Sequence, residues 1–289
     1  MKIRKAVIPV AGFGTRFLPA TKILPKEMLP IIDRPTIQFI VEEMVASGIE
    51  EIIFVTGRNK RSIEDHFDRA FELEHLLEGN PEKKPMLDEI IQIASLAKFV
   101  YVRQQQPLGN GHALLCAKEV VGDEPFAFAY GDDIIESDIP ATKQLLESFE
   151  KFPSTTFGVI EVLKEYVTRY GIIDPEKIEG EDWTVKVKGS VEKPPVDEAP
   201  SRYASCGRYI FTPDIFKALE EIKPGKGGEI WVVDAVEHLS KTQQIYARIF
   251  KNGIYHDCGN KAEFVKAIIS YSLKRDDLKE EIASYLKSI

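Results

Sequence analysis

The alternation of apolar runs with helical patterns is the feature that most limits the fold. Ile3–Val10 is an apolar run apart from Arg4 and Lys5, typical of a strand buried on both faces. Thr36–Ala46 has helical spacing and stops at Ser47-Gly48, and Glu51–Thr56 is a second apolar strand. The alternation continues with helices expected at 61–77, 111–121 and 140–149 and strands at 99–103 and 125–130. It predicts a doubly wound, mostly parallel α/β sheet with helices on both faces.

The pattern changes after Pro153, where strands are joined by loops instead of long helices. Strands are expected at 155–162, 184–191, 205–211 and 244–250, and helices at 213–222, at 229–240 and from about Lys261. KPPVDEAPS, at Lys193–Ser201, is too rich in proline for regular structure. We expect one domain over residues 1–289, with a first half to about 153, a small β-rich part over 154–260 and C-terminal helices over 261–289. An exposed excursion is expected at 71–97.

Composition excludes several classes of partner and compartment. The net charge of −8 argues against broad binding to nucleic acid or to anionic membranes. The three cysteines are scattered and fit no metal or disulfide pattern, which favours a reducing compartment. The chain shows no signal segment, and no apolar run approaches the ~20 residues of a membrane span. We therefore expect a cytoplasmic protein.

A glycine pair follows the first strand in AGFGTR, at Ala11–Arg16. No third glycine completes a dinucleotide fingerprint, and no G-K-[ST] completes a Walker loop. A second cation, Lys26, follows in the rigid context PKEMLP. Glycines let backbone N–H groups approach an anion, arginine braces two phosphate oxygens, and lysine is a point charge. This loop predicts a polyphosphate site, rather than a plain turn with solvated cations, made by Ala11, Gly12, Gly14, Thr15, Arg16 and Lys26.

Two acids end the strand at Pro125–Tyr130, in AYGDDI. Ligands of open α/β sheets bind at this edge, and Mg²⁺ is commonly shared between carboxylates and substrate phosphates. We predict Asp132 as a ligand of Mg²⁺, while Asp133 positions it or touches a sugar. The alternative is a pair of acids that caps a turn.

The phosphate loop resembles a known family. G-x-G-T-R followed by P-K resembles the signature of sugar-1-phosphate nucleotidyltransferases, and GFGTRFLPATKILPKEMLP resembles the bacterial UTP–glucose-1-phosphate uridylyltransferases. The resemblance implies a magnesium-dependent enzyme that makes UDP-glucose and pyrophosphate from UTP and glucose 1-phosphate. It also implies a nucleotide-binding first half, a sugar-binding second half and a homodimer or homotetramer.

The resemblance assigns further site residues. In VRQQQPLGNGHALLCA it implies that Gln104 and Gly109 contact the uracil, although Gln105 and Gln106 leave open which glutamine points inward. In IYHDCGNKAEF it implies a second acid near the metal, Asp257. From SVEKPP and RYGIID it implies sugar contacts by Glu192 and Gly171, and a sugar-phosphate contact by Lys193. The implied catalytic residues are Arg16, Lys26 and Lys193.

Some positions depart from the family pattern. GGEIWVVDA carries Trp231 and Val233 where a glutamine and a threonine are expected. Asn110 and Tyr130 also replace commoner residues. These departures leave open the identity of the sugar and the subunit contacts. The alternative within the same class of enzyme is the same chemistry with another pair, such as dTTP or a different hexose 1-phosphate. A non-catalytic sensor of sugar nucleotides is the alternative from another class. The missing third glycine argues against a dinucleotide oxidoreductase.

Overall fold

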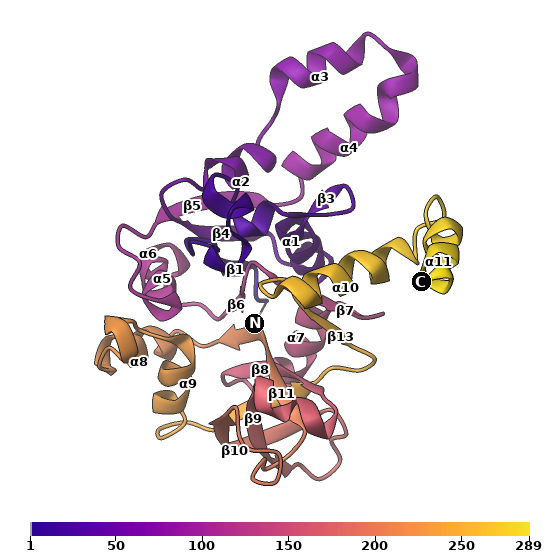
Figure 1. Cartoon of the computed structure of the whole chain (residues 1–289). Coiled ribbons are helices and arrows are strands. Elements are labelled where there is room, and N and C mark those ends of the chain that lie inside the picture. Colours follow the sequence, from indigo (N-terminus) through magenta and orange to yellow (C-terminus); the bar gives the residue numbers. More distant parts are fainter. Residues whose placement is uncertain (1) are drawn as a thin grey trace.

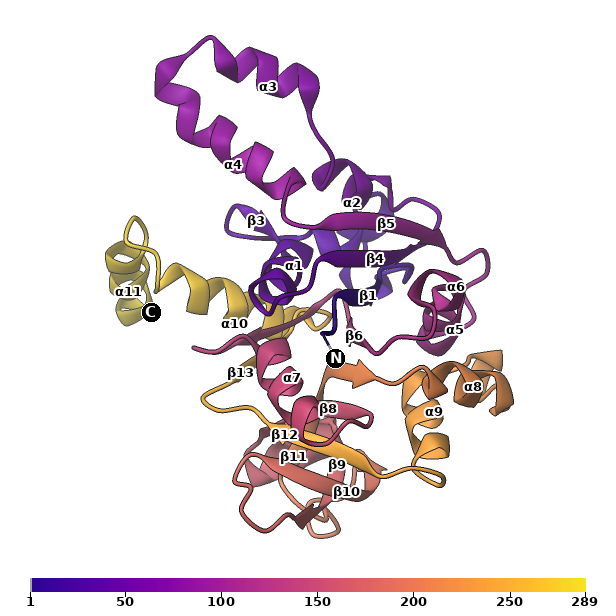
Figure 2. The same cartoon turned by 180° about the vertical axis from the view of Figure 1, so that it is seen from behind.

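The computed structural model describes residues 2–289, and its centre is a nine-stranded sheet (Figures 1 and 2). The strand order is β5-β4-β1-β6-β11-β8-β12-β10-β9. In that order the strands span Lys98–Arg103, Glu51–Thr56, Lys5–Pro9, Phe126–Ala129, Tyr203–Phe211, Thr156–Glu161, Ile245–Ile249, Thr184–Glu192 and Gly171–Lys177. One sheet therefore carries strands from both halves of the chain.

The expected doubly wound α/β sheet is confirmed, but parallel pairing is concentrated in its first half. Strands β5, β4, β1 and β6 are parallel neighbours. Strand β11 is antiparallel to both β6 and β8, and β10 is antiparallel to β12 and β9. Only β8 and β12 restore parallel pairing in the second half. Loops after Pro153 are too short for repeated helical crossovers, which parallel neighbours require.

Helices cover the sheet on both faces, and two apolar clusters form the core. One cluster includes side chains of α1 (Thr36–Ala46), α7 (Ala141–Lys151) and α10 (Lys261–Ser272). The other includes side chains of α5 (Asn110–Cys116), α6 (Lys118–Val121), α8 (Asp214–Glu221) and α9 (Val232–Leu239). Burial of apolar side chains on both faces explains why the central strands are continuous apolar runs.

The expectation of a single helix at 61–77 is wrong. The chain forms α2 (Arg61–His66) and α3 (Phe71–Glu78), and the break is fixed by Glu74. Its carboxylate accepts hydrogen bonds from Arg69 Nε at 2.7 Å and from the Ala70 amide at 3.1 Å. These bonds satisfy the start of α3.

A helix that the sequence did not predict, α4 (Lys84–Ala94), follows the NPEKKP turn. Its proline lies in the first turn, where a missing N–H costs nothing. Helices α3 and α4 form a hairpin that projects from the body of the molecule (Figure 1), at the expected excursion.

Two smaller strand pairs complete the fold. Strand β13 (Ile254–Asp257) pairs antiparallel with β7 (Asp133–Glu136), which the sequence did not predict. Strands β2 (Pro30–Ile31) and β3 (Arg34–Pro35) form a short hairpin. The expected C-terminal helix is two helices, α10 and α11 (Lys279–Ser288). The division into nucleotide-binding and sugar-binding parts stays a prediction.

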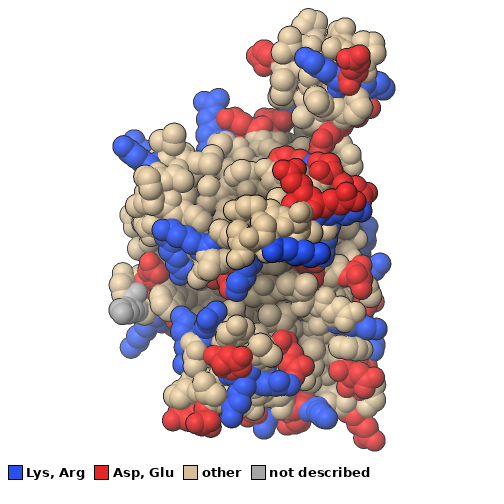
Figure 3. Space-filling model, turned by 45° about the vertical axis from the view of Figure 1, so that its right-hand side comes forward, with Lys and Arg blue, Asp and Glu red and all other residues tan. Residues whose placement is uncertain are grey.

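None of the helices within residues 2–289 has the length and apolarity needed to cross a membrane. Figure 3 shows one face, on which lysine and arginine side chains lie among aspartate and glutamate side chains, with a gathering of acidic side chains at the upper right.

Candidate active site

The phosphate loop, which carries Ala11–Arg16, follows β1, and the turn that carries Asp132 and Asp133, called the acidic turn below, follows β6. The two come together because β1 and β6 are parallel neighbours. Their carboxyl ends lie at one edge of the sheet, the usual place for ligands in such folds. In the loop, Gly14 has φ +64°, and a Cβ there would lie 3.1 Å from Cβ of Lys26. Thr21 Oγ1 donates to the Gly14 carbonyl at 2.7 Å. Glycine is therefore required for the loop to close over the segment that carries Lys26.

Lys26 forms an ion pair with Asp132 across this edge. Nζ of Lys26 lies 2.5 Å from Oδ2 of Asp132, and both side chains are largely buried. Burial by itself lowers the pKa of the Lys26 ammonium, but the negative charges of Asp132, Glu27 and Asp133, with the hydrogen bond to Asp132, together outweigh burial and raise it above its usual value. The lysine is therefore a permanent positive charge.

Asp132 and Asp257 converge on Gly259. A Cβ on Gly259 would collide with Oδ2 of Asp132 and lie 3.0 Å from Oδ1 of Asp257. The β13–β7 pairing places Asp257 opposite Asp133. Arg16 Nη1 also donates to the Gly259 carbonyl at 3.4 Å. Arg16, Asp132 and Asp257, which are far apart in the sequence, thus surround one glycine.

The acidic pair fits a magnesium ion better than a zinc ion. Burial raises the pKa of Asp257, and the neighbouring charge of Asp132 raises it further, so the two carboxylates repel each other. Within residues 2–289, no group of three or more histidine, cysteine or acidic side chains is arranged to hold a metal. Structural zinc needs four protein ligands, whereas Mg²⁺ uses one or two carboxylates together with phosphates and water.

Asp133 lies inside the protein rather than at the open edge. Its Oδ1 accepts a hydrogen bond from Tyr255 Oη at 2.8 Å, and its Oδ2 packs against Gly207, which has φ +70°. Burial, and next the charge of Asp132, hold the pKa of Asp133 well above its usual value. This placement favours support of Asp132 over a sugar contact, which stays a prediction. Sequence reasoning missed Tyr255.

Only one of the three consecutive glutamines is buried. Gln104 is 8% exposed, whereas Gln105 and Gln106 are exposed. Nε2 of Gln104 lies 3.0 Å from the carbonyl of Gly109 and 3.1 Å from Nδ1 of His112. Both predicted uracil residues therefore meet at one turn, and the Oε1 atom of Gln104 is left as an acceptor.

The turn at Gly109 is fixed by a distant segment that sequence reasoning did not assign to it. Gly109 has φ +96°, and a Cβ there would collide with the carbonyl of Ile230. The Ile230 amide donates to Leu108 O at 2.8 Å, and Ile230 O accepts from Gly111 at 2.8 Å. No periodicity in the sequence indicates this contact.

The predicted sugar residues lie where β9 and β10 pair. Gly171 is opposite Glu192, and a Cβ on Gly171 would lie 3.0 Å from Oε2 of Glu192. Lys193 Nζ lies 3.3 Å from Oε1 of Glu192, and both side chains are exposed. The Lys193 amide donates to Tyr170 O at 3.0 Å, and the ring of Tyr170 packs 6.1 Å from that of Tyr255. These contacts join β9 and β10 to the acidic site.

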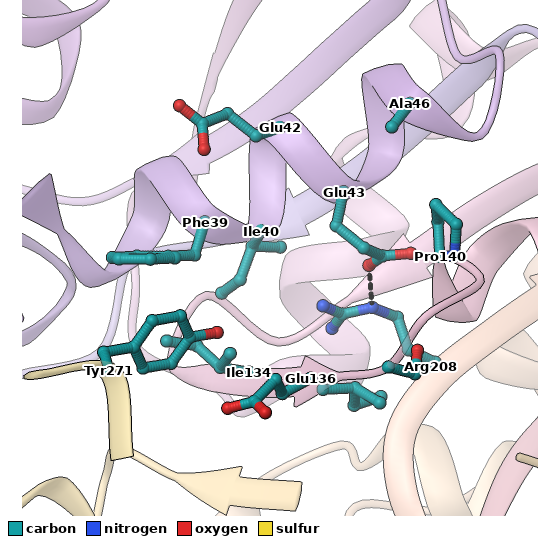
Figure 4. A pocket seen from close by; sticks show the side chains of 12 residues that line it. Phe39, Ile40, Glu42, Glu43, Ala46, Ile134, Glu136, Pro140, Arg208 and Tyr271 are labelled. Carbon is teal, nitrogen blue, oxygen red and sulfur yellow. Dashed lines mark hydrogen bonds and ion pairs between the residues drawn. The ribbon is translucent and has the colours of Figure 1, made fainter. Parts of the chain in front are cut away.

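A separate cavity of about 300 Å³ lies between α1, β7 and α10 (Figure 4). Inside it, Arg208 Nε donates to Oε2 of Glu43 at 2.8 Å. Glu43 also accepts from the Thr142 amide at 2.6 Å, so the ion pair holds α1, α7 and β11 together. Arg208 follows Gly207, which packs on Asp133. None of the predicted site residues lines this cavity. Its ion pair holds Arg208 in place, and the adjacent Gly207 packs on Asp133 of the acidic turn.

Comparison with known proteins decides the family. The model of the nucleotidyl transferase family matches residues 5–272. The chain belongs to this family. It is 47% identical over 288 residues to the UTP–glucose-1-phosphate uridylyltransferase of Bacillus subtilis, covering 100% of this chain and 97% of the relative. It is 50% identical over 289 residues to UTP–glucose-1-phosphate uridylyltransferase 1 of Staphylococcus saprophyticus, covering 100% and 99%. The predicted family is therefore confirmed.

Solved structures of similar proteins have the same fold. The UTP-bound enzyme from Acinetobacter baumannii superposes with a TM-score of 0.90 at 40% identity and covers 100% of both chains. A UDP-glucose pyrophosphorylase complexed with UDP-glucose superposes with a TM-score of 0.85 at 42% identity, covering 95% of this chain and 100% of that one. The first of these proteins binds UTP, and the second binds UDP-glucose.

Proposed function

We propose that this protein makes UDP-glucose and pyrophosphate from UTP and glucose 1-phosphate, with Mg²⁺ as its cofactor. The observation that carries the proposal is the meeting of Lys26, Arg16 and two acids at one sheet edge, beside the glycine loop. The full-length similarity to uridylyltransferases, at 47% and 50% identity, supports the choice of substrates.

The reaction joins two anions, so electrostatics dominates its barrier. A phosphate oxygen of glucose 1-phosphate attacks the α-phosphorus of UTP, a P–O bond forms, and the bond to the β-phosphate oxygen breaks as pyrophosphate leaves. The nucleophile is already an anion at neutral pH, so no general base is needed. Two like charges at ~4 Å repel by ~4 kcal/mol at an effective dielectric constant of 20. The protein must offset that repulsion and align the reactants.

Three cations are available for this task. Arg16 and Lys26 lie at the phosphate loop, where they stabilise the charge that develops on the leaving pyrophosphate. Lys193, directly after β10, binds the phosphate of glucose 1-phosphate. When substrate enters, phosphate oxygens compete with Asp132 for the Lys26 ammonium, and the Asp132 carboxylate would then be free to hold a metal ion.

Asp132 and Asp257 would hold the Mg²⁺ ion. Their mutual repulsion and their convergence on Gly259 fit a divalent cation that shares its coordination with substrate phosphates. When bound, the ion supplies charge neutralisation to the triphosphate. Asp133, held by Tyr255, keeps the neighbouring Asp132 in place.

Specificity for the base and the sugar follows from the remaining residues. The Gln104 amide donates internally, so its oxygen accepts the N3–H of uracil, whereas N3 of cytosine has no proton to donate. Glu192 accepts hydrogen bonds from sugar hydroxyls, and Gly171 leaves room for the ring.

The test is release of pyrophosphate with Mg²⁺ in a panel of UTP or dTTP with glucose 1-phosphate or galactose 1-phosphate. Release confined to UTP with glucose 1-phosphate supports the proposal. Release with another pair keeps the chemistry and changes the substrates. A folded protein that binds UDP-glucose but is silent with every pair would be a sensor.

We also propose a homodimer or homotetramer in the cytoplasm. The support is the set of exposed apolar side chains on and directly after the two C-terminal helices, namely Val265, Leu273, Tyr285 and Ile289. The three cysteines are free thiols, as a reducing compartment requires. Light scattering after size-exclusion chromatography measures the oligomeric state.

A further inference from the structure

A second lysine–carboxylate pair lies beside the first and is more deeply buried. Lys60 Nζ is 2.8 Å from Oε2 of Glu27, and the two side chains are 6% and 1% exposed. Glu27 is the residue after Lys26, in the short turn Lys26–Met28. Because a buried ion pair is costly to desolvate and seldom adds stability, its presence next to the candidate catalytic lysine calls for another explanation.

The pair joins three segments of the candidate active site. Lys60 ends the loop after β4 and precedes α2. In that loop Gly57 packs on the phosphate loop, because a Cβ there would lie 3.0 Å from Ala11 O. The side chain of Glu27 packs on the acidic turn, because a Cβ on Gly131 would lie 3.1 Å from Cγ of Glu27. Phosphate loop, lysine turn and acidic turn are thus held at one point.

The charges of the pair also decide which acid Lys26 faces. The Lys26 ammonium is attracted by Asp132 and next by Glu27, and both acids raise its pKa against the effect of burial. Burial raises the pKa of Glu27, and the charge of Lys60 counteracts it. Lys60 therefore occupies the Glu27 carboxylate and leaves Lys26 to Asp132 and the open edge of the site.

We propose that Lys60 and Glu27 are positioning residues, which align the Lys26 ammonium for the reaction without touching the substrate. Their burial prevents direct contact with a ligand. The proposal rests on the proposed function, in which Lys26 is catalytic. The proposal predicts that loss of the Lys60–Glu27 pair lowers turnover only when Lys26 is present.

The test is a double-mutant cycle. Removing Lys60 alone leaves a buried carboxylate unpaired and can unfold the chain, so the variant removes both charges, as Glu27→Gln with Lys60→Met. This variant should lower kcat by about 10-fold or more, since small displacements of a catalytic group are costly. In a Lys26→Ala background the same two changes should alter kcat by less than about 2-fold. An equal loss in both backgrounds, or wild-type kcat in the first, overturns the proposal.

A second measurement does not depend on turnover. A pulse of acetic anhydride followed by mass spectrometry reports how fast Lys26 is acylated. Loss of the pair should change the rate of Lys26 acylation by about 3-fold or more, because a displaced side chain presents its amine differently to the reagent. An unchanged rate overturns the proposal.

Arg248 provides a control for the acylation measurement. Arg248 is also a buried cation, paired with Glu147 at 3.0 Å, but it joins β12 to α7. Arg248→Met should leave Lys26 acylation unchanged. Wild-type protein that releases no pyrophosphate contradicts the proposed function, whereas the acylation rates still decide whether the pair positions Lys26.

Discussion

The Lys26 ammonium lies 2.5 Å from the Asp132 carboxylate, although 106 positions separate the two residues in the sequence. The pair joins the segment after β1 to the turn after β6, the two places where substrate phosphates and a metal ion are expected. It holds a permanent cation ready before substrate arrives, so little reorganisation is needed during the reaction.

We expect Lys26→Ala to lower kcat by at least ~100-fold, the scale of losing one pre-aligned electrostatic donor. The measurement is the initial rate of pyrophosphate release at saturating UTP and glucose 1-phosphate. Lys22→Ala is the matched control, because Lys22 is an exposed lysine in the same segment. Turnover of Lys26→Ala within a factor of about 3 of wild type would refute the role.

The acidic pair predicts the response to magnesium. Asp132→Asn and Asp257→Asn should each raise the Mg²⁺ concentration needed for half-maximal rate by about 10-fold or more, the typical effect of weakening a metal site. Titrating Mg²⁺ at fixed UTP measures this. Asp138→Asn changes an exposed acid just after β7 and should leave the titration unchanged. Identical titrations of all variants would show that these acids hold no metal.

Much of the sheet could be predicted because its central strands are apolar runs between helical patterns. The ranges of α1 and β4 agree with the sequence expectation, since each has a plain period and a glycine or polar stop. The helical hairpin of α3 and α4 could not be predicted, because the break between α2 and α3 depends on the Glu74 side chain, which accepts a hydrogen bond at the start of α3. Strand β7 was missed because its partner β13 is more than 100 residues away.

The site shows the same limit. Residue types at the phosphate loop and the acidic turn indicate their chemistry, and parallel neighbours bring them together. The supporting contacts are different. The bond from Tyr255 to Asp133, the Lys60–Glu27 pair and the contact of Ile230 with the Gly109 turn all join distant segments. No local pattern encodes such pairs, because each partner alone is an ordinary residue.

Gln104 should govern the choice of base. Its oxygen is the free acceptor for the uracil N3–H, so Gln104→Leu should reduce the ratio of kcat/KM for UTP to that for CTP by about 10-fold or more. The control is Gln105→Leu, because Gln105 is exposed. Gln104→Leu with its preference for UTP intact would remove Gln104 from base recognition.

Lys193 should act on the sugar substrate rather than on the nucleotide. Lys193→Ala should raise the KM for glucose 1-phosphate by about 10-fold, the scale of a lost charge-assisted hydrogen bond, with a smaller change for UTP. Lys188→Ala is the matched control, because Lys188 lies on β10, which ends just before Lys193, and pairs with Asp174 at 3.2 Å. Equal changes in both KM values would contradict a specific contact with the sugar phosphate.

His66 predicts a pH dependence of stability. Burial lowers its pKa below the usual 6.5, and Nε2 lies 3.0 Å from the Gln38 side-chain oxygen. As the pH falls through 6.5, His66 binds a proton in the unfolded chain but stays neutral in the folded chain. The free energy of unfolding therefore decreases by up to about 1.4 kcal/mol per unit of difference between the two pKa values. The free energy of unfolding, measured with urea, should therefore decrease more for wild type than for His66→Gln between about pH 7.5 and about pH 5.5. His75 is 81% exposed and gains little from folding, so His75→Gln should follow wild type. Parallel curves for wild type and His66→Gln would show that His66 has no such linkage.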